Sequence, residues 1–380
     1  MLLKRFLKIS VVSIVLIFTL SIIFSLSGCK EAAETESEVV VETVTETVIE
    51  TVEVEKESPY TYEKLREMAE ARSYEGEPAK DARLAYCDIY WGVPFTDAVI
   101  GGIKEEWALS GGLEDNLLIL DNKSDAATAI ENADIVYNWG PDVFIEFQPF
   151  ASINANISRQ AKEEGVFLIA VDIPVPGFPF MGVDNYAAGI LAGEWAIEQI
   201  ENVFGGWDNV DRVYYGTNPV AGETVMLRTQ GSEDVLAEKY GDTARLDTEG
   251  TKAILFETVD NAEVAKTGMD SYLAKFPDDE NILYFSVNEV SISGIQASAE
   301  AVGRWQPENW IIIGHGGDAN GQQLVRDGII DASIAYFPER YGRYLIPGAL
   351  ANIYGNPVPA YMYVENEVLT LDNIDDIYPQ

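Results

Sequence analysis

Residues 141–172 read PDVFIEFQPFASINANISRQAKEEGVFLIAVD. The apolar run 143–147 predicts a strand, and the residues after it fit a helix through Lys162. Gly165 is the expected C-terminal stop of that helix, because glycine readily adopts the left-handed conformation that ends helices. A second apolar run follows at 166–171. A strand, a helix and another strand in succession are typical of a parallel sheet, so this stretch predicts an α/β fold.

The same alternation extends in both directions from this stretch. Before it, strand patterns at 83–87 and 116–120 alternate with helix patterns at 96–109 and from Ser124 to just before Gly140. After it, Asp184 is placed to cap a helix that runs through Ala196. Further expected strands are 212–215, 253–257, 282–287 and 310–313, with helices after Val225, Glu263, Ser291 and Asn320. Two similar half-folds therefore follow one another, which predicts two doubly wound parallel-sheet lobes.

The folded region, from about Ser58 to Gln380, is longer than one typical core supports. No long Gly/Ser or Pro linker divides it. Open parallel sheets bind ligands at the carboxyl ends of their strands, so the expected binding site is a cleft between two such edges.

The first 28 residues have the layout of an export signal. Lys4, Arg5 and Lys8 precede an uncharged apolar run, 9–26. Leu26-Ser27-Gly28-Cys29 then resembles the bacterial lipobox, which implies cleavage before Cys29 and lipidation of its sulfur. The alternative is an uncleaved membrane helix, because about 18 apolar residues can span a bilayer. Either reading places the rest of the chain on the extracytoplasmic side, in the periplasm or at the outer surface.

Acidic residues dominate the composition. The formal net charge is −38, which argues against nucleic-acid binding because such a surface repels phosphate. Much of the excess lies in residues 29–57, where VVVETVTETVIETVEVEKE covers 39–57. We expect a solvated tether there, with a short helix or an aggregation-prone strand as the alternatives. The second cysteine, Cys87, falls in an expected strand and is interpreted as buried and inert.

The folded region resembles the ribose-binding type of periplasmic binding protein, the type I substrate-binding proteins of sugar ABC transporters, over residues 82–360. The matching segments are Pro94-Phe95 with Gly102, Val183-Asp184-Asn185 through Gly189, Ser286 to Glu289 with Gly294, Ile312 to Asp318, Gly328 to Ala335, and Gly355 to Pro359. Their order and spacing carry the resemblance more than any one of them.

This resemblance implies that the chain crosses between the lobes three times, near Val183, near Tyr336 and near Ala360. The expected N-terminal lobe is 58–183 with 337–360, and the expected C-terminal lobe is 184–336 with 361–380. Two departures from the family bear on the ligand. The family commonly has an arginine where this chain has Ile173, and the acid of its Gly-x-Asp-Gly motif is displaced here to Asp318.

Binding a sugar requires flat apolar surface and fixed hydrogen-bonding groups. Tyr90, Trp91 and Phe95, in the turn after the first strand, are the aromatic candidates, and Asp172 and Asn288 end strands at the cleft edge. His315, which follows the expected strand 310–313, is a further candidate, and the resemblance adds Arg228, Asp318 and Tyr336. Structural roles remain open for eight of these nine: packing for the aromatic residues, a helix cap for Asn288, a cap or loop role for Asp172, a surface ion pair with Glu223 or Glu233 for Arg228, and a local backbone contact for His315.

The sequence offers little for an enzyme, since nucleophilic triads would depend on one histidine and no phosphate-binding or dinucleotide motif is found. No cofactor and no metal site is expected. The predicted function is a monomeric, lipid-anchored binding protein that delivers a monosaccharide or similar polyol to an ABC permease. Alternatives are a nucleoside or signalling-sugar binding protein, or a ligand-sensing subunit for a membrane kinase.

Overall fold

The computed structural model describes residues 58–379. The predicted signal peptide, its Cys29 and the acidic tether lie outside these described residues. Within the described part, no helix combines the length and the apolar character needed to cross a membrane. Strands and helices alternate along most of the chain, as the sequence predicts.

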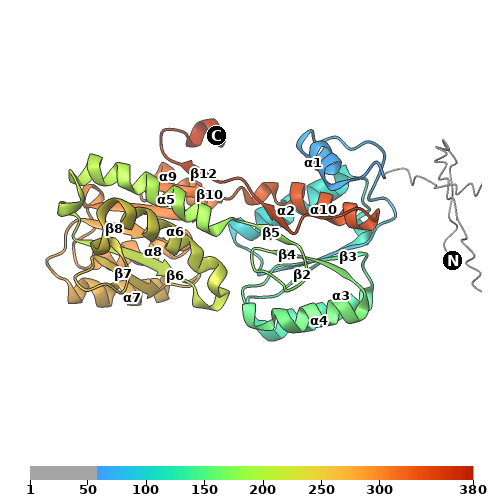
Figure 1. Ribbon diagram of the computed structural model, residues 1–380, viewed down its shortest axis with the longest axis horizontal. Helices are drawn as coiled ribbons and strands as arrows, with labels where there is room; N and C mark the ends of the chain where they lie inside the picture. Colours follow the sequence, from blue (N-terminus) through green and yellow to red (C-terminus); the bar gives the residue numbers. More distant parts are fainter. Residues whose placement is uncertain (1–57, 380) are drawn as a thin grey trace, which may run out of the picture. The chain divides into compact units, whose positions relative to one another are not determined.

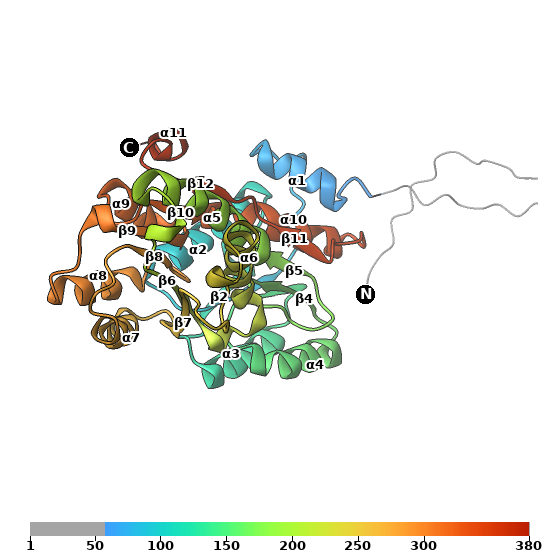
Figure 2. The same cartoon turned by 60° about the vertical axis from the view of Figure 1, so that its left-hand side comes forward.

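The first sheet has six parallel strands in the order β11-β5-β4-β3-β1-β2. They are β1 (Leu84–Asp88), β2 (Leu117–Asp121), β3 (Val143–Glu146), β4 (Phe167–Val171), β5 (Phe180–Gly182) and β11 (Tyr361–Tyr363). Helices α2 (Pro94–Leu109) and α10 (Gly342–Ile353) cover one face, and α3 (Ala126–Trp139) and α4 (Asn154–Glu164) cover the other (Figure 1, Figure 2). Because both faces are buried, the inner strands are continuously apolar rather than alternating.

The second sheet has the order β12-β10-β9-β8-β6-β7. Its strands are β6 (Arg212–Thr217), β7 (Ala253–Glu257), β8 (Ile282–Phe285), β9 (Trp310–Gly316), β10 (Ala332–Ala335) and β12 (Glu367–Leu369), and only β12 is antiparallel to its neighbour. Helices α5 (Asn185–Gln199) and α6 (Glu223–Tyr240) pack on one face. Helices α7 (Ala262–Lys275), α8 (Ile292–Ala301) and α9 (Ala319–Arg326) pack on the other. Two sheets of this kind confirm the predicted fold class.

Helices α5 and α6 pack closely against each other because glycine residues lie at their contact. A Cβ added at Gly231 would lie 2.3 Å from the carbonyl oxygen of Tyr186, and one added at Gly189 would lie 2.2 Å from that of Arg228. Real Cβ atoms do not approach oxygen so closely. The absence of a side chain at these two positions therefore sets the distance between the helices.

The chain passes between the two sheets three times. Two passages, between β5 and α5 and between β10 and α10, contain the residues expected, Val183 and Tyr336. The third was expected near Ala360 and lies later, between β11 and β12. Met362 of β11 is buried in the core of the first sheet while its two tyrosine neighbours face outward, so the first sheet extends beyond residue 360.

A further helix, α1 (Tyr62–Glu70), precedes the first strand and packs on α10. The Arg66 guanidinium donates to the backbone oxygen of Arg343 at 2.5 Å and lies 3.6 Å from the ring centre of Tyr344. These contacts join the beginning of the described chain to a segment about 280 residues later.

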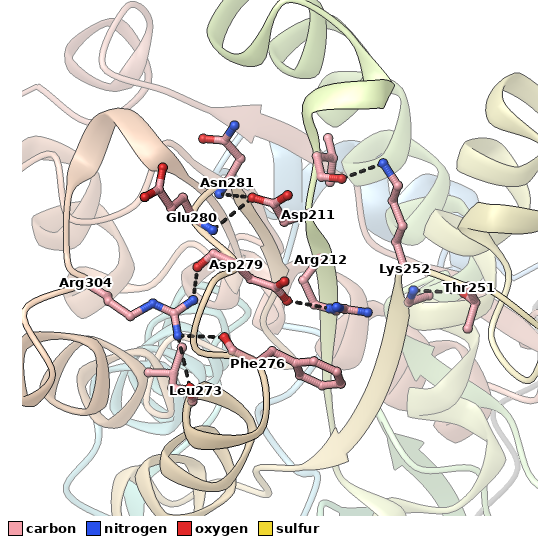
Figure 3. Close-up of polar contacts among 12 residues, drawn as sticks. Asp211, Arg212, Thr251, Lys252, Leu273, Phe276, Asp279, Glu280, Asn281 and Arg304 are labelled. Atoms are coloured by element: carbon pink, nitrogen blue, oxygen red, sulfur yellow. Dashed lines mark hydrogen bonds and ion pairs between the residues drawn. The ribbon is translucent and has the colours of Figure 1, made fainter.

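The amino ends of β6 and β8 are held by polar contacts that are internally satisfied (Figure 3). The Asp211 carboxylate accepts from two successive backbone amides, at 2.9 Å each. Arg304 donates to three backbone oxygens, and Arg212 pairs with Asp279 at 2.8 Å. Asp211, Arg212, Asp279 and Arg304 each have a protein partner, so this edge is structural. At the opposite edge of the sheet, buried polar groups such as the side-chain oxygen of Asn218 have no hydrogen-bond partner among the described residues.

Candidate functional site

A cavity lies at the carboxyl ends of the strands, and residues from both sheets line it. Many of the lining residues lie in the segments that follow strands: Ile89 and Tyr90 after β1, Phe147 after β3, Asp172 after β4, Asn218 after β6, Asp260 after β7, and Val287 to Val290 after β8. Others are Val93, Phe95, Thr96, Pro149, Ile173, Ala221, Val225, Arg228, His315, Gly316, Asp318 and Tyr336. Apolar walls with a few polar groups are the usual composition of small-molecule sites.

All the residues that the sequence singled out line this cavity, with the exception of Trp91. The Trp91 side chain is 51% exposed in the loop before α2. Phe95, in the first turn of α2, instead packs edge-on against Tyr341, with ring centres 5.8 Å apart.

Arg228 is positioned by hydrogen bonds to residues of the second lobe. Its Nε donates to the side-chain oxygen of Asn185 at 2.5 Å, and one terminal nitrogen donates to the backbone oxygen of Val287 at 2.7 Å. Its guanidinium lies 4.9 Å from the ring centre of Tyr336. The surface ion pair considered as an alternative is not formed, because Glu233 lies near Arg245 and Arg228 lines the cavity.

Asp172 ends β4 in a left-handed backbone conformation, with φ of 55°. Its Oδ1 accepts from the backbone amide of Val183, and both carboxylate oxygens are 3.2 Å from the hydroxyl of Tyr341. Burial raises the pKa of this carboxyl to about 6, although the positive charge of Arg228 opposes the rise. Val183 and Tyr341 belong to two different passages between the sheets, so Asp172 also ties those passages together.

His315 pairs with the hydroxyl of Tyr336, with 2.7 Å between Nδ1 and the oxygen. Burial holds the pKa of His315 well below its usual value, and the nearby positive charge of Arg228 acts in the same direction. The imidazole is therefore neutral and adds no charge to the cavity.

Asn288 and Asp318 combine a place in the cavity wall with local capping. The Asn288 oxygen accepts from the Ser291 amide at 3.1 Å, and its NH₂ group donates to Asp260. Asp318 caps α9 by accepting from the amides of Asn320 and Gly321. Capping and lining are compatible, because each side chain has hydrogen-bonding capacity left over.

Four polar lining residues were missed by the sequence analysis: Thr96, Asn218, Asp260 and Glu289. Asn218 directly follows β6 as Asp172 follows β4, so the position of a polar residue just after a strand would have indicated it, whereas Asp260 lies three residues beyond β7. Glu289 accepts from the Gly317 amide at 2.9 Å and from the Ser333 hydroxyl at 2.5 Å. Its bonds connect three separate segments, which no local pattern reveals.

Beside the cavity, Asp88 is fully buried at the end of β1. Its Oδ1 accepts from the Tyr86 hydroxyl at 2.7 Å, whereas its Oδ2 has no partner among the described residues. Burial raises the pKa of Asp88 to about 7. Ionising this carboxyl therefore costs folding free energy at neutral pH.

Asp88→Asn is expected to stabilise the protein at pH 8 on the order of 1 to 3 kcal/mol, since one pKa unit corresponds to about 1.36 kcal/mol. With the folded pKa above the unfolded value of about 3.9, the contribution of Asp88 to stability is complete below pH ~4 and is lost as pH rises through about 7. The variant should show a flatter stability profile between pH 5 and 8 in urea unfolding. Asp115→Asn, at an exposed site, is the control. Destabilisation of the Asp88 variant at pH 8 would contradict the assignment.

Comparison with known proteins agrees with this geometry. The family model described as periplasmic binding protein domain matches residues 90–357, so the chain belongs to that family. No curated protein matches the chain.

Several solved structures share the fold at low sequence identity. A solute-binding protein of Actinobacillus succinogenes with bound D-allose has 17% identity and a TM-score of 0.64, covering 78% of this chain and 100% of its own. The Caulobacter myo-inositol binding protein has 19% identity and a TM-score of 0.66, with coverage of 80% and 96%. A periplasmic ribose ABC transporter protein of Conexibacter woesei has 16% identity and a TM-score of 0.65, with coverage of 80% and 97%.

Proposed function

We propose that this protein is the extracytoplasmic substrate-binding component of an ABC importer and that it binds a monosaccharide or similar polyol in the cavity. The observation that carries the proposal is the cavity itself, whose walls come from the strand ends of two separate sheets. Asp172 stands on one side and Arg228 on the other, so a bound polyol would bridge two lobes joined by three short passages. The sugar and inositol ligands of the structurally similar proteins support this choice of ligand class.

The chemistry of the lining residues supports the same ligand class. Phe95, Phe147 and Val225 offer apolar surface to the C–H faces of a sugar ring. Arg228 uses two of its five N–H groups on protein oxygens, which leaves the others for neighbouring hydroxyls. Asp172 supplies acceptors from the first lobe, and Asp260 supplies them from the same lobe as Arg228.

Ligand binding is expected to bring the two lobes together, because closure adds contacts that neither wall makes alone. The endogenous ligand would be identified by mass spectrometry of material released from the denatured, purified protein, beside calorimetry with D-allose, D-ribose and myo-inositol. Small-angle scattering with a saturating ligand should show a smaller radius of gyration. A radius that stays constant at saturation would contradict closure. The absence of binding by every sugar and polyol tested would contradict the ligand class.

We further propose that the mature protein is lipid-anchored at Cys29, which the lipobox-like Leu26 to Cys29 supports. Cys29→Ala should abolish incorporation of radiolabelled fatty acid in the producing cells, because the acylated sulfur is gone. Cys87→Ala is the matched control and should leave labelling intact, since the Cys87 thiol is buried. Continued labelling of the Cys29 variant would rule out this anchor.

A further inference from the structure

The charges in the cavity wall do not balance. Four of the lining residues carry carboxyl groups: Asp172, Asp260, Glu289 and Asp318. The lining residues contain only one arginine, Arg228, and no lysine, and His315 is neutral. Burial raises the pKa of all four carboxyl groups, and a neutral sugar brings no positive charge that would favour their ionised forms.

Arg228 offsets only one end of this acidic wall. Its charge favours ionisation of Asp172 and of Asp260, against the effect of their burial. Glu289 and Asp318 lie close enough to repel each other, and neither forms an ion pair with a lysine or arginine in the described part of the chain. The uncompensated charge is therefore at the Asp318 end.

The cavity wall also has more hydrogen-bond acceptors than donors to satisfy them. Asn218 and Asn288 both donate their side-chain N–H groups to Asp260. This orientation leaves the side-chain oxygen of Asn218 buried and without a donor, in a residue that is only 5% exposed. The cavity thus has surplus acceptors, and a ligand must bring donors to satisfy them.

Tyr90 places an aromatic ring beside this acceptor-rich end. Tyr90 belongs to the first lobe, and the negative charges of Asp260 and Asp318, which belong to the second lobe, act on its hydroxyl. An ammonium group has three N–H donors and no acceptor, carries the compensating charge, and is attracted to the face of a tyrosine ring. A hydroxyl group offers one donor and no charge.

We propose that the cavity selects a polyol that carries an amino group, such as an amino sugar, over the neutral polyol of the same shape, with its ammonium group held between Tyr90 and Asp318. The inference rests on the proposed function and specifies the ligand class within it. Arg228, at the other end, is left to hold the hydroxyl groups.

Calorimetry on the purified mature protein with matched pairs of sugars tests this inference. The pairs are D-glucosamine with D-glucose, D-galactosamine with D-galactose, and D-mannosamine with D-mannose, and the N-acetylated forms provide neutral controls of larger size. The amino sugar of at least one pair is expected to bind ten-fold or more tightly than its neutral partner, and N-acetylation should remove the advantage.

Asp318→Asn is the informative variant, because asparagine caps a helix as well as aspartate does and so leaves α9 intact. It should reduce about ten-fold the ratio of the affinity for the amino sugar to the affinity for its neutral partner, because only the amino sugar loses a contact with a charged carboxylate. Asp327→Asn, exposed at the other end of α9, is the matched control and should change neither value.

Different results would overturn the amine inference and the proposed function. Neutral sugars that bind as tightly as the amino sugars, or an unchanged preference in Asp318→Asn, would overturn the amine inference and leave the proposed function standing. Failure of all the sugars and amino sugars to bind would overturn the monosaccharide function and the amine inference together.

Discussion

Replacing Arg228 with alanine is expected to weaken ligand binding by roughly 10- to 150-fold. A hydrogen bond to a charged group contributes about 1.5 to 3 kcal/mol, and about 1.4 kcal/mol corresponds to ten-fold in affinity. The structure adds a second expected effect, a lower melting temperature without ligand. The variant leaves the Asn185 and Val287 oxygens without their donor and removes the positive charge that Asp172 and Asp260 share.

Calorimetry with the identified ligand and thermal unfolding without it measure the two effects separately. Arg228→Lys keeps the charge and loses the planar fork, so it should recover much of the stability and little of the affinity. Arg245→Ala, on the exposed side of the same lobe, is the control. An Arg228→Ala protein that binds as tightly as the parent would remove Arg228 from the site.

The second large effect is expected at Gly231, where α5 and α6 meet. Gly231→Ala should destabilise the protein by about 1 to 3 kcal/mol, because the new Cβ has no room beside the Tyr186 carbonyl and the helices must separate. The gain in helix propensity, about 1 kcal/mol, offsets only part of this loss.

Gly101→Ala, in the middle of α2, is the matched control for Gly231→Ala. A Cβ at Gly101 meets nothing within 4 Å, so only the propensity gain remains and the variant should be slightly more stable. Urea unfolding of both variants measures the difference. Equal stabilities would show that α5 and α6 are not in close contact at Gly231.

The strands that the sequence predicted are those with local signals. Runs such as 143–147 and 166–171 are apolar, are bounded by turn residues and lie beside helices of ordinary length, and they became β3 and β4. Strands β5 and β11 have three residues each and pair with one another across about 180 positions. Short strands with distant partners give no periodicity, so the last passage between the sheets was placed too early.

The candidate site also contains some residues with a local signal in the sequence and others without one. Asp172 directly follows β4, and Asn288 directly follows the strand expected at 282–287, although β8 itself ends three residues earlier, at Phe285. Asp260 is three residues beyond β7. Leu255 and Glu257 of that strand are exposed, so the end of the strand, and with it the place of Asp260 at the sheet edge, was less apparent from the sequence. The contact of His315 with Tyr336 joins two strands, and the sequence gives the direction of neither side chain.

The packing of α10 and β11 fixes the order in which the protein can be completed. The first lobe needs α10 to cover its sheet and to receive α1, and it needs β11 to close its edge, yet these segments are nearly the last to be synthesised. The emerging chain therefore lacks a finished N-terminal lobe until about residue 363 is available, and the long-range pairing that follows is slow. Such a delay keeps the polypeptide unfolded for longer, which would suit the export that the proposed extracytoplasmic function requires.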